Sequence, residues 1–269
     1  LFMTDWYIDQ MKSKSYESNP LPISFVHDEY VGDKLDYTAH IPKVESRWEI
    51  KDFIDFIKNP KSTVEMQNGQ TIHFYPTNKI RIPVDKNNII KNKVVAAKYN
   101  DSIVSYIDID IKGNALYKNR LMMLDLIANN NWKRPVYFSP GAFEDEDYLW
   151  MKNYLQLEGM IYKLVPIKTK VDKDTNPMDM GGLDADKMYS IVMKWDWGNS
   201  RGDIYHDPET RKNSISYRSV LSRLMDKLIA EGKLDKAKKV IELSLTEMPV
   251  EKFGYYSMVE PFARGYYEV

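Results

Sequence analysis

The sequence predicts a mixed α/β domain, in which helices flank a layered sheet, followed by an all-α helical hairpin. The first observation is an alternation of strand-like and helix-like stretches over the first two-thirds of the chain, which favours a layered sheet over a helix bundle. The second is an apolar period that becomes helical after Pro208 and stays helical to the end. We therefore expect an α/β domain over residues 1–183 and a helical segment over residues 184–269.

Local signals place the first elements of the α/β part. A helix is expected over residues 5–11, where Thr4 is a suitable N-cap. A short strand is expected over residues 20–26, because prolines bound an apolar run there. Apolar residues at helical spacing then predict a helix over residues 48–57.

Asn68-Gly69 is the strongest short-range turn signal in the chain, because this dipeptide readily adopts the positive φ angles of a tight hairpin turn. It predicts a hairpin of two strands over residues 63–67 and 71–75, with a third strand over residues 79–84. A further strand over residues 103–111 alternates isoleucines with aspartates. One of its faces is therefore expected to be apolar and the other acidic.

Two helix–strand units are predicted next. The first has a helix over residues 116–127 and a strand over 134–139, and the second has a helix over 148–157 and a strand over 160–165. Gly159 is expected to end the second helix. Successive units of this kind favour a partly parallel sheet with right-handed crossovers.

The C-terminal part is predicted to be helical throughout. After a helix over residues 184–195, two apolar stripes joined by a turn at residues 231–233 predict a helical hairpin. The hairpin resembles the second half of a tetratricopeptide repeat, whose small, apolar and proline positions match Gly232, Ala237, Ile241 and Pro249. Met225 departs from that pattern, because the repeat normally has Gly or Ala at this position.

Composition narrows the classes of function. The 38 Lys and Arg residues balance 39 Asp and Glu residues, so the net charge of −1 offers no overall field that would hold nucleic acid. Cys is absent, which removes disulfides and thiolate chemistry. No apolar run approaches the roughly 20 residues of a membrane span, so this fragment is expected to be soluble by itself. The chain begins without an initiator Met and stops inside an apolar helical period, so we expect it to be part of a longer protein.

The densest aromatic spot predicts a contact surface. Trp195 and Trp197 flank Asp196, and Trp150 lies upstream. Paired rings beside an acid suit a sugar, because the rings offer flat apolar area and the acid orients hydroxyl groups. The rings equally suit the seam between the two predicted domains, and the seam is the favoured interpretation.

A carboxylate pair is the second candidate site. Asp108 and Asp110 fall on one face of the predicted strand, where two acids can serve acid/base or metal chemistry. A solvated polar face of a half-exposed strand explains the same pattern without any catalytic role. The four histidines have no metal-ligand spacing, and the chain has no phosphate-binding loop and no nucleophile elbow. The sequence therefore predicts no catalytic, cofactor or metal residue within the fragment.

Five motifs in order carry a resemblance to a known family. Together they resemble the C-terminal portion of a bacterial membrane-protein family that is similar to the protein O-mannosyltransferases of the glycosyltransferase C superfamily. The motifs lie at residues 4–11, 20–24, 133–139, 157–166 and 188–198.

The resemblance implies a transmembrane bundle upstream of Leu1, a polyprenyl-phosphate sugar donor for the parent protein, and a place on the extracytoplasmic (periplasmic) side of the inner membrane. The fragment would then handle an acceptor protein or glycan, or brace the membrane part, without catalysing transfer itself. Two other hypotheses stay open. One is a scaffold module whose repeat-like helices bind a protein or peptide, and the other is a free-standing hydrolase that uses Asp108 and Asp110.

Overall fold

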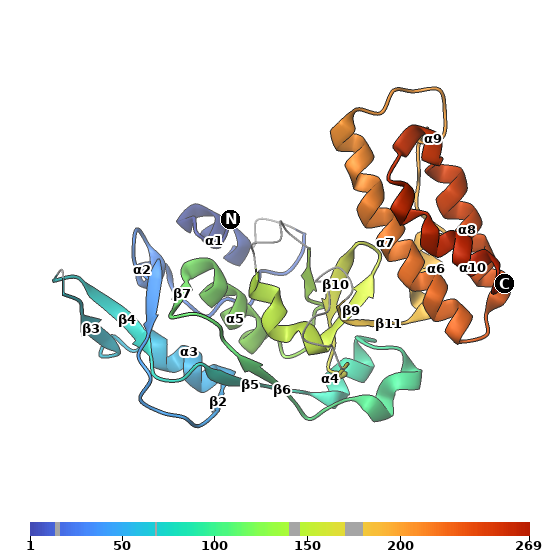
Figure 1. Cartoon of the computed structure of the whole chain (residues 1–269). Coiled ribbons are helices and arrows are strands. Elements are labelled where there is room, and N and C mark those ends of the chain that lie inside the picture. The colour runs from blue at the N-terminus through green and yellow to red at the C-terminus, as the bar shows by residue number, and fades with distance from the viewer. Residues whose placement is uncertain (14–16, 68, 140–145, 170–179) are drawn as a thin grey trace. The chain divides into compact units, whose positions relative to one another are not determined.

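The computed structural model describes residues 1–13, 17–67, 69–139, 146–169 and 180–269 (Figure 1). These residues form two compact units. Unit 1 comprises the described residues of 1–136 with 146–151 and 166–168, and unit 2 comprises 137–139, 152–165, 169 and 180–269. The mixed α/β class and the C-terminal helical region are confirmed. The predicted domain boundary between residues 183 and 184 is a statement about which parts of the chain fold independently, and it stays a prediction.

The described part of unit 1 contains two sheets with the strand orders β3-β4-β1-β7 and β2-β5-β6. The strands are β1 (Tyr37–His40), β2 (Trp48–Glu49), β3 (Thr63–Glu65), β4 (Thr71–Tyr75), β5 (Lys79–Pro83), β6 (Tyr106–Asp110) and β7 (Ala115–Tyr117). The helices are α1 (Asp5–Lys12), α2 (His27–Tyr30), α3 (Ile50–Lys58), α4 (Lys86–Lys91) and α5 (Lys118–Asn130), with the 3-10 segment η1 (Ala97–Ser102).

The two strands of the hairpin predicted around Asn68-Gly69 are confirmed, and Asn68 itself lies outside the described residues. Strands β3 and β4 pair antiparallel, and Gly69 has a φ of 78°, which glycine tolerates at no steric cost. In the same sheet β1 runs parallel to β4 and antiparallel to β7. In the second sheet β5 pairs parallel with β2 and antiparallel with β6. Helix α3 follows the predicted periodicity and buries one apolar face, formed by Ile50, Phe53, Ile54 and Ile57.

Residues 20–26 do not form the predicted strand. The backbone there joins no sheet, because side chains satisfy its polar groups instead. Asp125 on α5 accepts hydrogen bonds from the Ser24 N–H and hydroxyl, both at 2.6 Å. Lys58 donates to the Ser24 carbonyl at 2.9 Å, and Lys12 donates to the Phe25 carbonyl. An apolar run between prolines cannot reveal such long-range partners.

The described part of unit 2 contains one sheet with the order β11-β9-β10-β8. The strands are β8 (Tyr137–Phe138), β9 (Leu155–Glu158), β10 (Ile161–Leu164) and β11 (Gly182–Leu183). The helices are α6 (Ala185–Val192), α7 (Pro208–Ala230), α8 (Leu234–Glu247), α9 (Val250–Phe253) and α10 (Glu260–Tyr266), with the 3-10 turn η4 (Tyr256–Met258).

The second helix–strand unit is not formed as predicted. Residues 146–154 form the 3-10 segment η2 (Glu146–Tyr154), which is followed at once by β9. Gly159 lies in the tight turn from β9 to β10 with a φ of 67°, and it ends no helix. Because β10 is antiparallel to both β8 and β9, the predicted parallel crossovers are absent from these three strands. Residues 155–158 alternate apolar and polar side chains, which is the period of a strand, and they form β9 although their composition also suits a helix.

The helical hairpin of the C-terminal part is confirmed. In unit 2, α7 and α8 pack side by side as the two long helices of the orange and red region in Figure 1. Met225 on α7 is fully buried, and a Cβ placed on Gly265 of α10 would lie 2.4 Å from its sulfur atom. Gly265 therefore leaves the space that the large Met225 side chain needs. Assignment to the tetratricopeptide repeats stays a prediction.

Candidate functional site

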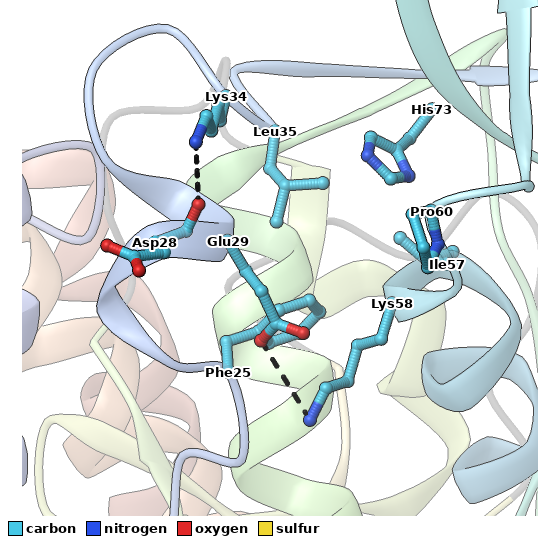
Figure 2. A pocket seen from close by; sticks show the side chains of 9 residues that line it. All are labelled: Phe25, Asp28, Glu29, Lys34, Leu35, Ile57, Lys58, Pro60 and His73. Carbon is cyan, nitrogen blue, oxygen red and sulfur yellow. Dashed lines mark hydrogen bonds and ion pairs between the residues drawn. The ribbon is translucent and has the colours of Figure 1, made fainter.

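Unit 1 contains a pocket with a volume of about 210 Å³. Its walls come from segments far apart in the sequence: the extended segment before α2, helix α2, the loop after it, the end of α3, and β4 (Figure 2). The lining residues are Phe25, Asp28, Glu29, Lys34, Leu35, Ile57, Lys58, Pro60 and His73. The pocket thus combines an apolar floor with charged and polar groups, which is the usual composition of a small-molecule site.

Two lysines of the lining are held by oxygen atoms of the protein itself. Lys58 donates to the Ser24 carbonyl at 2.9 Å and lies 4.0 Å from the Glu29 carboxylate. Lys34 donates to the backbone carbonyl of Asp28 at 2.8 Å. Figure 2 shows the Lys58–Glu29 and Lys34–Asp28 contacts as dashed lines. These bonds fix the positions of the two ammonium groups before any ligand arrives.

The floor of the pocket is anchored from below. Asp125 is fully buried beneath Ser24, and burial raises its pKa, while the two bonds from Ser24 oppose that rise. Asn129 donates to the same carboxylate at 2.8 Å. The neighbouring Phe25 ring is therefore held rigidly, with the Lys58 ammonium 5.4 Å from its centroid. A site whose supporting side chains are themselves bonded is preorganised.

Leu35 has a backbone conformation that leucine rarely adopts. Its φ is 61°, in the left-handed region, although its side chain is only 5% exposed and lines the pocket. For a residue with a branched side chain this conformation costs about 1–2 kcal/mol. Strain of this kind concentrates at binding and catalytic sites, where the surrounding structure maintains it. The pocket wall therefore carries a feature that stability alone does not favour.

His73 faces the pocket from β4. Burial lowers the pKa of its imidazole, and the Ile57 carbonyl and Glu29 only partly offset that effect. The ring is therefore neutral at pH 7. Its Nδ1 atom is buried and makes no hydrogen bond of ordinary geometry. In Figure 2 the ring lies between Leu35 on one side and Ile57 and Pro60 on the other.

The predicted carboxylate pair lies on one exposed face of β6, as the alternation indicated. Arg81 binds Asp108 in a bidentate manner, with distances of 2.7 and 2.9 Å. Arg47 approaches Asp110 to 2.6 Å and also donates to the carbonyls of Ile80 and Ile109. The Arg81 hydrogen bond lowers the pKa of Asp108 most strongly. The arrangement is a surface ion-pair network, and a catalytic role for either aspartate stays a prediction.

Trp195 and Trp197 meet in unit 2, with their ring centroids 5.6 Å apart. Both contact Tyr217 of α7, at 5.4 and 5.5 Å, so the three rings connect the end of α6 to the hairpin. The carboxylate of Asp196 accepts from the Gly198 N–H at 2.8 Å, which orders the turn between the rings and the next residues. Trp197 Nε1 is buried and makes no hydrogen bond within the described residues.

Trp150 belongs to unit 1, where its ring lies beside an arginine. The Arg120 guanidinium lies 6.0 Å from the Trp150 ring and 5.6 Å from the Tyr117 ring. Trp150 and the Trp195–Trp197 pair therefore do not belong to the same unit. A role of any of these rings in sugar or acceptor contact stays a prediction.

No sequence pattern predicted the pocket. Its lining comes from three stretches, 25–35, 57–60 and 73, which no periodicity connects. His73 has no metal-ligand spacing to another histidine in the sequence, and the described residues contain no group of three or more His, Asp or Glu side chains able to hold a metal ion. The stretch Gly32-Asp33-Lys34 before Leu35 is typical of a turn and was the one sequence signal near the pocket. The positive φ of Leu35 itself is seen only in the structure.

Comparison with known proteins assigns a family to the chain that carries this pocket. The family model described as TMEM260-associated domain 2 matches residues 1–187. The chain belongs to this family. Neither a curated protein nor a solved structure matches it.

The TMEM260-associated domain is, by its name and family, a domain associated with a membrane protein. The match spans all of unit 1, including the pocket, and the sheet of unit 2. Helices α7 to α10 lie beyond the matched residues. Within the described ranges, no helix has both the length and the apolar character needed to cross a bilayer.

Proposed function

We propose that this chain is an extracytoplasmic accessory domain of a polytopic membrane glycosyltransferase, and that it handles the acceptor. The family match over residues 1–187 carries this proposal, because it associates the chain with a membrane protein. The five ordered motifs add a resemblance to the O-mannosyltransferases. On this proposal the transfer step, with its polyprenyl-phosphate donor, takes place in the membrane part of the parent protein.

The pocket of unit 1 is the proposed point of contact with the acceptor. It lies inside the matched region, its floor is anchored by Asp125, and Leu35 keeps a strained conformation in its wall. The anchored floor supports a binding role most directly, because a site that is held in place before the ligand arrives loses less conformational freedom on binding. The reaction itself is not assigned to any residue of this chain.

Transfer kinetics of the full-length parent test the proposal. Initial rates would be measured against acceptor concentration for the intact parent and for a parent lacking residues 1–269. If the domain handles the acceptor, the acceptor KM rises by about tenfold or more and kcat at saturation is retained, because uniform binding is lost. Unchanged kinetics would contradict the proposal. A loss of kcat at unchanged KM would instead support the bracing role.

The extracytoplasmic location can be tested separately. Because the chain has no Cys, a single cysteine at an exposed position such as Lys238→Cys on α8 gives one reactive thiol in this domain. In intact cells, a membrane-impermeant maleimide should label this variant of the parent protein, and the parent without the added cysteine should show no increase. Labelling that requires permeabilised membranes would place the domain on the cytoplasmic side and contradict the proposal.

A scaffold that binds a protein or peptide is the second candidate function. Several tyrosines of the helical region are exposed, and tyrosine is enriched in protein interfaces: Tyr205, Tyr256 and Tyr267 are 83%, 73% and 93% exposed. Truncation of all three to serine would then abolish capture of the natural acceptor polypeptide, whereas pocket variants would not. Equal capture by the triple variant removes this candidate.

A further inference from the structure

Some polar groups of the pocket already make hydrogen bonds within the protein, and others do not. The ammonium groups of Lys34 and Lys58 already donate to protein oxygens. Of the Glu29 carboxylate, Oε2 accepts from the Val26 N–H at 2.7 Å. No hydrogen bond within the described part of the chain uses Glu29 Oε1. The bonds hold both ammonium groups in place, but Lys34 uses only one of its three N–H donors in the described contacts, and Glu29 Oε1 keeps its acceptor capacity.

His73 adds a second acceptor. In a neutral imidazole one nitrogen carries the proton and the other accepts. The backbone group beside the ring is the Ile57 carbonyl, which can accept a hydrogen bond but cannot donate one. Nδ1 is buried beyond the reach of a ligand, so a ligand can meet only Nε2. If Nδ1 carries the proton toward the protein, Nε2 offers a lone pair to the pocket.

Charge and size limit the ligand further. Asp28 and Glu29 balance Lys34 and Lys58, so with a neutral His73 the lining has no formal net charge. The lining therefore has no excess charge of either sign to offset the cost of removing water from a charged ligand. The pocket has a volume of about 210 Å³. It is smaller than the roughly 300–1,000 Å³ of a site for drug-sized ligands.

We propose that this pocket binds a small, uncharged molecule rich in hydroxyl groups, which donates hydrogen bonds to His73 Nε2 and Glu29 Oε1 and lies against the Phe25 ring. A flat array of C–H groups on such a molecule complements the aromatic ring. Free polyols and the terminal ring of a glycan share this chemistry. The identification of a glycan as the source rests on the proposed function, whereas the binding itself does not.

The tautomer of His73 gives the first test. Long-range ¹H–¹⁵N spectra of the full chain resolve four imidazoles, and His73→Gln assigns the signal of residue 73. We expect a neutral ring at pH 7 with the proton on Nδ1 and an unprotonated Nε2. An Nε2–H tautomer, or a charged ring, would overturn the proposal, because His73 would then offer the ligand no acceptor.

Titration with defined probes gives the second test. Myo-inositol and D-mannitol represent free polyols, and methyl α-D-mannopyranoside and methyl α-D-glucopyranoside represent terminal glycan rings. Putrescine and acetate are the charged probes. At least one hydroxyl-bearing probe should shift the His73 Nε2 resonance toward the hydrogen-bonded value. No shift with any of the four, or a shift with a charged probe alone, would overturn the proposal. The stronger group of uncharged probes identifies the source.

Variants separate binding from folding. His73→Phe keeps a ring but removes the acceptor, and it should weaken binding of the active probe by about tenfold or more. Glu29→Gln keeps the shape and should weaken it severalfold. His40→Phe is the matched control, because His40 is also a histidine whose burial lowers its pKa but does not line the pocket. Equal affinity in His73→Phe, or equal loss in His40→Phe, contradicts the proposed contacts. If His73→Phe does not fold, Glu29→Gln decides the result.

Discussion

The two units each bury a cationic side chain completely, but they satisfy it in different ways. In unit 1 the Lys118 ammonium lies 2.7 Å from Asp36 and 3.3 Å from Asp5, and it donates to the Gly32 carbonyl. In unit 2 the Arg218 guanidinium makes no ion pair with any described residue. It donates at 2.7 Å to the carbonyl of Met248 and at 2.7 Å to that of Gly254.

The two buried cations stabilise their units through different interactions. Lys118 is a point charge that draws together α1, the loop after α2 and the start of α5, which are distant in sequence. Arg218 offers a planar fork, and it uses that fork to satisfy carbonyls at the end of α8 and after α9, where helix ends leave acceptors unpaired. The buried cation of unit 1 is therefore satisfied by charge pairing, and that of unit 2 by hydrogen-bond geometry.

The largest effect is expected for Arg218→Met. Two buried carbonyls would lose their donors, so we expect the free energy of unfolding to fall by about 2–4 kcal/mol. Relief of the cost of burying the guanidinium, which lowers its pKa, offsets part of the loss. Urea unfolding of the full chain measures this change. Arg218→Lys keeps the charge but not the fork, so a loss close to that of Met supports the geometric account, whereas full stability of the Lys variant would contradict it.

Lys118→Met should cost about 1–3 kcal/mol at pH 7, because Asp5 and Asp36 would lose their cation. Unlike the Arg218 effect, this cost should depend on pH. The Gly32 N–H and then Lys118 lower the pKa of Asp5, so the stabilisation is present above its ordinary value of about 3.8 and is lost as the pH falls through the lowered pKa. Unfolding at pH 7 and pH 3 measures the difference. If Lys118→Met lowers the free energy of unfolding by the same amount at pH 7 and pH 3, the contrast between the charge-paired Lys118 and the hydrogen-bonded Arg218 is contradicted.

Asp125→Asn tests whether the anchoring of the extended segment is part of the stability of unit 1. The amide group introduced at this position would face the donors of Ser24, so one bond becomes a donor–donor contact. We expect a loss of about 1–2 kcal/mol in urea unfolding, with weaker binding of the pocket probes. Asn129→Ala is the matched control, because it removes two bonds to Asp125, one to its carbonyl and one to its carboxylate, and leaves Ser24 in place. A smaller loss for Asp125→Asn than for the control would contradict the anchoring.

The smallest effect concerns the histidines of unit 1. Burial lowers the pKa of His40 and His73 below 6.5, so the unfolded chain binds protons that the folded chain does not. Stability should therefore be full above about pH 6.5 and fall as the pH drops below it, by up to about 1.4 kcal/mol for each unit of pKa difference. His73→Gln should flatten part of this slope. An unchanged slope would show that His73 does not titrate differently in the folded state.

Elements whose signals are local were predicted correctly. The hairpin around Asn68-Gly69 and the hairpin of α7 and α8 follow from residues that contact each other within one or two turns of chain. The prediction of a strand over residues 20–26 was wrong because Ser24 bonds to side chains that are distant in sequence. Its partner Asp125 lies 101 residues away, and its partner Lys58 lies 34 residues away. The prediction of a helix over residues 148–157 was wrong because a glycine with positive φ is equally suited to a helix end and to a tight turn between strands. In the structure Gly159 forms the turn between the antiparallel strands β9 and β10.

The same contrast applies to the candidate sites. The aspartates of β6 share one strand face and the rings of Trp195 and Trp197 meet, as their two-residue spacing indicated, and a role of either pair as a site stays a prediction. The pocket was not found, because the pairing of Glu29 with Lys58 and the placement of His73 beside Ile57 are set by the packing of α3 and β4. A single sequence does not encode such placements in any spacing.

Acceptor kinetics of the full-length parent with a single pocket variant test the central claim most directly. Initial rates of sugar transfer would be compared for His73→Phe and for the control His40→Phe over a range of acceptor concentrations. If the pocket of unit 1 engages the acceptor, His73→Phe raises the acceptor KM by about tenfold at unchanged kcat, and the control changes neither. An unchanged KM in His73→Phe, with the domain folded, would contradict the account.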